Sequence, residues 1–183
     1  MNEKSFSIGI IVSSTREGRS GAAVSQWVLE EIKQRTEADV RIIDLRSYEL
    51  PLLGEGTPTK LDQFKADITA LDAFVFVTAE YNHSIPASLK NALDYLREEW
   101  HNKAAGIVSY GSAGGARAAE HLRGILGELK VADVRAHVLL SLFHDFENFS
   151  TFKPQTSIHK NNLDALVAEI TAWGQALKTV RSN

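Results

Sequence analysis

The first apolar run of the sequence is Phe6-Ser7-Ile8-Gly9-Ile10-Ile11-Val12, and it leads directly into the polar segment Ser13-Ser14-Thr15-Arg16-Glu17-Gly18-Arg19-Ser20-Gly21. A short, nearly continuous run rich in β-branched residues is typical of a strand that is buried on both faces of a sheet. The polar segment contains glycine and is expected to be a loop. From Ala22 onward the apolar residues recur at helical spacing. This part of the sequence therefore predicts a strand, a loop and a helix in succession.

The same succession recurs along the rest of the 183 residues. Apolar runs predict four further strands at residues 40–45, 73–78, 104–109 and 134–142, and helical periodicity predicts helices over 60–71, 86–96, 116–129 and 162–180. Residues 143–161 are irregular and rich in phenylalanine, and are the one stretch where a tail or lid could lie. Strands that alternate with helices predict a three-layer α/β fold with a parallel sheet. At about 150 residues per domain, residues 1–183 are expected to form a single domain.

The composition excludes several classes of protein. Apolar residues make up 44% and charged residues 23% of the chain, which is typical of a globular domain. The absence of cysteine excludes disulfides, thiolate metal sites and catalytic thiols, and the six histidines lack the spacing of metal ligands, so no metal site is expected. A net charge of −3 argues against a general nucleic-acid binder. The apolar run at 6–12 is shorter than the roughly 20 residues that span a bilayer and lacks a signal-peptide cleavage site, so we expect a cytoplasmic protein without a membrane segment.

The polar loop at residues 13–21 has the chemistry of an anion site. It carries the hydroxyl groups of Ser14 and Ser20, the guanidinium groups of Arg16 and Arg19, and the free N–H groups of a helix start, and this combination fits phosphate. The loop lacks the Gly-Lys-Ser/Thr ending of nucleoside triphosphate-binding loops and the G-x-G-x-x-G pattern of dinucleotide-binding proteins. The alternative interpretation is a plain polar loop in which Ser20 caps the helix.

Two further loops follow predicted strands. Residues 78–87 offer backbone amides, an aromatic ring and an amide side chain, and residues 109–117 are rich in glycine, which lets a flat ligand approach the backbone closely. Taken singly, the first could be a capped surface loop and the second a flexible turn. If the strand order is 2-1-3-4-5, all three loops converge at the switch point between strands 1 and 3. A phosphate site beside two loops suited to a planar ring predicts a mononucleotide such as FMN.

The three loops resemble the signatures of the NADPH-dependent FMN reductase family, which has a flavodoxin-like fold. The family's phosphate loop, Gly-Ser-x-Arg-x-x-x-Ser, corresponds to residues 13–20. Its Pro-Glu-Tyr-Asn-x-Ser-x-Pro motif, followed by Leu-Lys-Asn-Ala-x-Asp, corresponds to residues 79–94, and its Ser-Tyr-Gly-x-x-Gly-Gly-x-Arg-Ala motif corresponds to residues 109–118. Two positions depart from the pattern. Ser13 replaces glycine, which would matter if residue 13 needed a positive φ, and Ala79 replaces proline.

The resemblance implies an enzyme in which NADPH or NADH gives a hydride to bound FMN. The flavin would then pass two electrons to a quinone, an azo or nitro compound, a metal oxyanion or free flavin. Because the cofactor carries that chemistry, no catalytic acid, base or nucleophile is expected among the side chains. Two alternatives stay open: a flavodoxin-like electron carrier that does not itself oxidise NAD(P)H, and a mononucleotide-binding module without flavin. The resemblance also implies a homodimer or a dimer of dimers.

The resemblance further implies which residues bind the cofactor. The flavin phosphate is expected at Ser14, Arg16, Arg19 and Ser20. The ring is expected to be lined by Ala79, Glu80, Tyr81, Asn82 and Ser84, mostly through backbone amides, while Gly111, Gly114 and Gly115 would leave room for its edge. Arg117 would either reach the phosphates of the pyridine nucleotide or pair with Glu120, three residues further along the same predicted helix.

Overall fold

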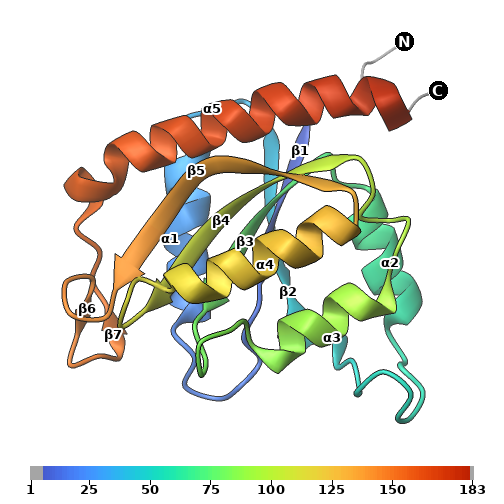
Figure 1. Cartoon of the computed structure of the whole chain (residues 1–183), viewed down its shortest axis with the longest axis horizontal. Coiled ribbons are helices and arrows are strands. Elements are labelled where there is room, and N and C mark those ends of the chain that lie inside the picture. The colour runs from blue at the N-terminus through green and yellow to red at the C-terminus, as the bar shows by residue number, and fades with distance from the viewer. Residues whose placement is uncertain (1–5, 182–183) are drawn as a thin grey trace.

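The computed structural model describes residues 6–181 and contains a five-stranded parallel sheet (Figure 1). The strands are β1 (Ser7–Val12), β2 (Asp39–Asp44), β3 (Ala73–Ala79), β4 (Lys103–Gly111) and β5 (Val131–Ser141). They lie in the order β2-β1-β3-β4-β5, and every neighbouring pair runs parallel. The predicted α/β fold and the predicted strand order are both confirmed.

Helices cover both faces of this sheet (Figure 1). One face carries α1 (Gly21–Lys33) and α5 (Thr156–Arg181), and the other carries α2 (Leu61–Thr69), α3 (Ala87–Tyr95) and α4 (Ala116–Glu128). A short 3-10 helix (Leu45–Tyr48) follows β2. Because helices cover both faces, the three inner strands are buried along their whole length. Continuous burial of this kind is what the unbroken apolar runs predicted.

Two apolar cores lie on opposite sides of the sheet. The core beneath α2, α3 and α4 surrounds Trp100, whose side chain is fully buried. Its indole lies 6.1 Å from the ring of Phe64, 5.1 Å from that of Phe74 and 6.2 Å from that of Phe76, measured between ring centroids. The core beneath α1 and α5 is mainly aliphatic. The first core therefore depends on one large aromatic group.

The segment 143–161 is more regular than its sequence predicts. It contains a hairpin of β6 (Phe146–Glu147) and β7 (Thr151–Phe152), and α5 begins at Thr156 rather than at residue 162. The buried carboxylate of Asp145 organises the segment, because it accepts hydrogen bonds from the main-chain N–H groups at 141 and 155 and lies 2.8 Å from Nε2 of His159. Such polar contacts leave no apolar periodicity, so periodicity alone does not predict them.

Replacing Trp100 by alanine should destabilise the fold severely. The substitution leaves a cavity among three aromatic rings, and such changes cost about 3–5 kcal/mol in the free energy of unfolding. Trp173 on α5 is the matched control, because its side chain is 50% exposed. Trp173→Ala should cost no more than about 0.5 kcal/mol. Urea unfolding measures both variants, and equal losses would contradict the central position of Trp100.

Candidate functional site

Three loops meet above the carboxyl ends of β1, β3 and β4: a first loop (residues 13–20), a second loop (residues 80–86) and a third loop (residues 111–115). The N–H of Ser13 donates to the carbonyl of Val77 at 3.1 Å, which ties the first loop to β3. The N–H of Glu80 donates to the carbonyl of Tyr110 at 2.9 Å, which ties the second loop to β4. The convergence predicted from the sequence is confirmed.

The side chain of Tyr81 joins the second loop to the first. Its hydroxyl lies 2.8 Å from Oγ of Ser14 and accepts a hydrogen bond of 2.8 Å from Nε of Arg16. The guanidinium group of Arg16 also lies 5.7 Å from the centroid of the Tyr81 ring, at the distance of a cation–π contact. Three residues expected at the site are thus in direct contact. Ser14 is buried, while Arg16 is exposed to the solvent above the loop.

The second loop turns sharply between Tyr81 and Ser84. The main-chain groups of these two residues exchange both hydrogen bonds, at 2.9 and 3.1 Å. Asn82 and His83 between them have positive φ values of 47° and 75°. Asparagine and histidine both adopt positive φ values more often than most residues that carry a side chain. The turn therefore fixes the course of the backbone where the ring was expected.

Arg117 and Glu80 connect the third loop's helix to the second loop. The side chain of Glu80 is almost fully buried, forms an ion pair with the guanidinium group of Arg117 and accepts a hydrogen bond of 3.2 Å from the main-chain N–H of that residue. Glu120, the partner predicted as one alternative, lies 3.4 Å from Arg123 instead. The spacing of residues along α4 therefore does not predict the ion-pair partner of Arg117. That partner is Glu80, which directly follows β3.

The third loop depends on glycine at two consecutive positions. Gly114 and Gly115 have φ values of 67° and 75°, which favour glycine. A Cβ atom on Gly115 would lie 2.7 Å from Cβ of Ser109 and 2.8 Å from the main-chain nitrogen of Tyr110. At Gly111, a Cβ atom would lie 3.1 Å from Cβ of Glu80. The third loop thus lies flat against β4 and the second loop.

The first loop contains buried hydrogen-bond donors that lack a partner. Arg19 forms an ion pair with Asp44 at the end of β2, but its Nε and Nη1 atoms are buried and have no partner within residues 6–181. The hydroxyl of Ser13 is also buried and has no hydrogen-bond partner in that part of the chain. Ser20 precedes α1 without capping it, because its Oγ donates to the carbonyl of Ser150 at 3.2 Å. Uncapped helix N–H groups and buried guanidinium donors fit an anionic group such as phosphate.

Several residues around the loops were not predicted from the sequence. Oγ of Ser88 donates to the carbonyl of Ser13 at 2.6 Å, and Ser109 contacts both Gly114 and His137. Burial, followed by the nearby Tyr81, raises the pKa of Tyr110 above its ordinary value, so its hydroxyl stays protonated. Ser88 and Ser109 lie within or beside the quoted motifs, but no sequence signal connects Ser88 to Ser13 or Ser109 to His137.

Residues 6–181 contain no group of three or more His, Asp or Glu side chains arranged to hold a metal ion. In the same part of the chain, none of the helices has the length and apolar character needed to cross a membrane.

A doubly wound parallel sheet with a loop of hydroxyl and guanidinium groups after its first strand, and two further loops beside it, defines a flavodoxin-like, mononucleotide-binding protein. The profile of the family described as NADPH-dependent FMN reductase matches residues 6–145. The chain belongs to this family, and it is an NAD(P)H-dependent oxidoreductase that uses FMN.

Similar proteins agree with this assignment. The chain is 30% identical over 180 residues to "NAD(P)H-dependent FMN reductase LOT6" of Saccharomyces cerevisiae, which covers 88% of this chain and 94% of that protein. It is 29% identical over 192 residues to "Quinone reductase" of Escherichia coli, covering 99% of this chain and 100% of that protein. The solved structure of the flavoenzyme NAD(P)H:(acceptor) oxidoreductase FerB from Paracoccus denitrificans has a TM-score of 0.73 at 19% identity, covering 93% of this chain and 98% of that one. This last likeness supports the fold.

The two departures from the family pattern fit the backbone. Ser13 has no positive φ, so its side chain causes no strain there. Ala79 is the buried last residue of β3. Unlike the proline of the family pattern, it has a main-chain N–H, which a strand accommodates. Ser13 therefore causes no distortion in the first loop, and Ala79 causes none in the second.

Gly115→Ala should weaken FMN binding at least tenfold and lower the free energy of unfolding by about 1–3 kcal/mol, because the new Cβ atom would overlap β4 and residue 115 requires a positive φ. Gly124→Ala on α4, the helix that follows Gly115, is the control, since a Cβ atom at Gly124 meets nothing within 4 Å. That variant should be more stable by up to about 1 kcal/mol and bind FMN normally. FMN fluorescence titration and thermal unfolding give the two values. Normal FMN binding by Gly115→Ala would contradict the role of the third loop.

Proposed function

We propose that this protein passes two electrons from NADPH or NADH, through bound FMN, to a small-molecule acceptor such as a quinone. Azo and nitro compounds, metal oxyanions and free flavin are the other acceptors proposed. The observation that carries the proposal is the meeting of Ser14, Arg16 and Tyr81 above the switch point of the sheet. FMN supplies the redox chemistry when bound, accepting a hydride and releasing two electrons.

The phosphate of FMN is proposed to bind at Ser14, Arg16, Arg19 and Ser20. Two contacts support this position. The hydroxyl of Ser14 and Nε of Arg16 both form hydrogen bonds with the hydroxyl of Tyr81, so their polar groups lie close together. Arg19 brings two buried N–H donors, and its ion pair with Asp44 holds the guanidinium group in place. A dianionic phosphate would satisfy these donors with charge-assisted hydrogen bonds.

The flat ring is proposed to lie against the backbone of the second and third loops. Ala79, Glu80, Tyr81, Asn82 and Ser84 would line it from one side, and Gly111, Gly114 and Gly115 would admit its edge. Main-chain N–H groups held in fixed turns stabilise negative charge on a ring without rearranging, as the donors of an oxyanion hole do. The turn between Tyr81 and Ser84 uses the N–H groups of these two residues internally, and it holds Asn82 and His83 in a fixed conformation beside the proposed ring.

Arg117 is proposed to contact the phosphates of the pyridine nucleotide. Glu80 holds the guanidinium group at one end, while 42% of the Arg117 side chain stays exposed. A guanidinium group that is held and half exposed can bind a second anion at the entrance of the site. No side chain is proposed as a catalytic acid or base.

The two alternative functions differ in ways that one experiment separates. Arg16 and Arg19 at the phosphate loop and a net charge of −3 favour an enzyme over an acidic electron carrier. Purified protein with flavin absorbance would exclude the module without flavin. Consumption of NADPH that accelerates when a quinone is added would exclude the carrier. Colourless protein that ignores saturating FMN would contradict the proposed function.

We also propose that residues 1–183 act as a single FMN-binding domain in the cytoplasm and assemble as a homodimer or a dimer of dimers. Phe143 and Phe149 support an association, because both side chains are 62% exposed and their rings lie edge to face at 5.5 Å. Contiguous exposed apolar surface is a feature of interaction sites. Light scattering on purified protein gives the mass of the assembly.

Arg16→Ala should weaken FMN binding by about 1.5–3 kcal/mol, the value of a hydrogen bond to a charged group. Riboflavin, which lacks the phosphate, should bind wild-type protein poorly and respond little to the substitution. Arg97→Ala is the control, because Arg97 is exposed and lies between α3 and β4, at the end of the sheet opposite the three loops. Identical FMN titration curves for wild type and Arg16→Ala would reject the assignment of Arg16.

A further inference from the structure

The hydroxyl of Ser109 joins the third loop to two strands. Ser109 lies on β4 and is fully buried. Its Oγ lies 2.7 Å from the carbonyl oxygen of Gly114 and 2.8 Å from Nε2 of His137 on β5. These contacts connect the loop, an inner strand and the edge strand of the sheet. His137 belongs to none of the motifs that predict the site.

The direction of both hydrogen bonds follows from the groups involved. A carbonyl oxygen can only accept, so the single hydroxyl hydrogen of Ser109 goes to Gly114. Oγ of Ser109 must then accept from His137, which places a hydrogen on Nε2 of that imidazole. His137 thus donates to Ser109, and Ser109 donates to Gly114 of the third loop.

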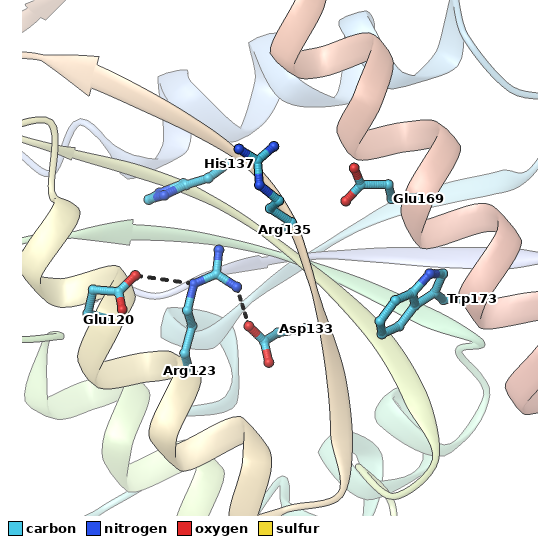
Figure 2. A pocket seen from close by; sticks show the side chains of 7 residues that line it. All are labelled: Glu120, Arg123, Asp133, Arg135, His137, Glu169 and Trp173. Carbon is cyan, nitrogen blue, oxygen red and sulfur yellow. Dashed lines mark hydrogen bonds and ion pairs between the residues drawn. The ribbon is translucent and has the colours of Figure 1, made fainter.

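The surroundings of His137 support this protonation state. The residue lines a groove of about 860 Å³ between α4, β5 and α5 (Figure 2). Burial, followed by the positive charge of Arg123, lowers the pKa of His137 to about 4. The imidazole is therefore neutral near pH 7 and has one N–H to give. The other charged groups lining the groove are Glu120 on α4, Asp133 and Arg135 on β5, and Glu169 on α5.

β5 bulges next to His137, and side chains hold the bulge. Ala105 of β4 is opposite Asp133 and Ile107 is opposite His137, so one residue of β4 faces three of β5. Arg123 donates to the carbonyl of Val134 at 2.9 Å, and Glu169 accepts from the N–H of Ala136 at 2.9 Å. These contacts fix the backbone from which His137 reaches Ser109.

The end of the third loop needs such an anchor because Gly114 and Gly115 cannot supply a side-chain contact of their own. Gly114 and Gly115 have no side chain beyond Cα, and both adopt positive φ values. The Gly114 N–H donates to the carbonyl of Gly111 at 3.1 Å, which closes the turn. The Gly114 carbonyl is oriented by Ser109. Without that contact, Gly114 would keep its hydrogen bond to Gly111 at the end of β4 but would lose its contact with Ser109 inside the strand.

We propose that Ser109 and His137 are positioning residues that hold residues 111–115 in the shape that receives the flat ring of FMN. The inference rests on the proposed function. Ser109 acts directly on the loop, and His137 acts through Ser109. The pair therefore controls contacts to the ring, whereas Arg16 controls contacts to the phosphate.

The test compares Ser109→Ala and His137→Leu with wild type. Each should raise the dissociation constants of FMN and riboflavin by the same factor, about three- to tenfold, which corresponds to one lost hydrogen bond. Amide hydrogen exchange of residues 110–118 in the flavin-free protein should become faster in both variants. The double variant should bind FMN no more weakly than the weaker single variant, because the two residues form one chain of contacts.

Two controls separate positioning from a general loss of structure. Ser25→Ala also removes a buried serine hydroxyl, but that hydroxyl has no partner within residues 6–181, so flavin affinity and exchange should not change. His137→Gln keeps a side-chain N–H donor and should restore most of the affinity lost in His137→Leu. If Ser109→Ala does not fold, the two His137 variants carry the test.

The experiment distinguishes a failure of this inference from a failure of the proposed function. Wild-type affinity and exchange in Ser109→Ala and His137→Leu, with FMN bound normally, would overturn this inference and leave the proposed function standing. A wild-type protein that binds no FMN would overturn the proposed function and the inference together.

Discussion

The parallel pairing of β1 with β3 is the constraint on which the site depends. Val12, the last residue of β1, lies opposite Val77, and the N–H of Ser13 continues the pairing by donating to the Val77 carbonyl. β1 leads to α1 on one face of the sheet, while β3 leads to α3 on the other, so the first and second loops start side by side and then diverge. Every polar contact between the first and second loops follows from this divergence.

Most of the fold could be predicted because the inner strands are uniformly apolar. The edge strand β5 was predicted to begin at residue 134 but begins at Val131, since polar residues such as Asp133 interrupt its apolar pattern. The first turns of α5 are polar as well, so its start at Thr156 was missed. Periodicity detects the faces that helices and strands bury, and it does not detect ends that are held by hydrogen bonds.

The loops of the site could be predicted, but several of their internal contacts could not. Hydroxyl, guanidinium and glycine residues after successive strands were enough to place Ser14, Arg16 and Tyr81 close together. The ion pair of Arg117 with Glu80 and the contact of Ser109 with His137 join different elements across the fold. Their partners depend on how α4 and β5 pack, which a single sequence does not encode in any short pattern.

The bulge in β5 also affects how the sheet can grow. An exposed edge strand normally offers a row of free N–H and C=O groups to which a further strand can pair. Here Arg123 covers the carbonyl of Val134 and Glu169 covers the N–H of Ala136, so the row is interrupted at the middle of the edge. Strand addition along β5, the usual route to aggregation of open sheets, is thereby opposed by two charged side chains.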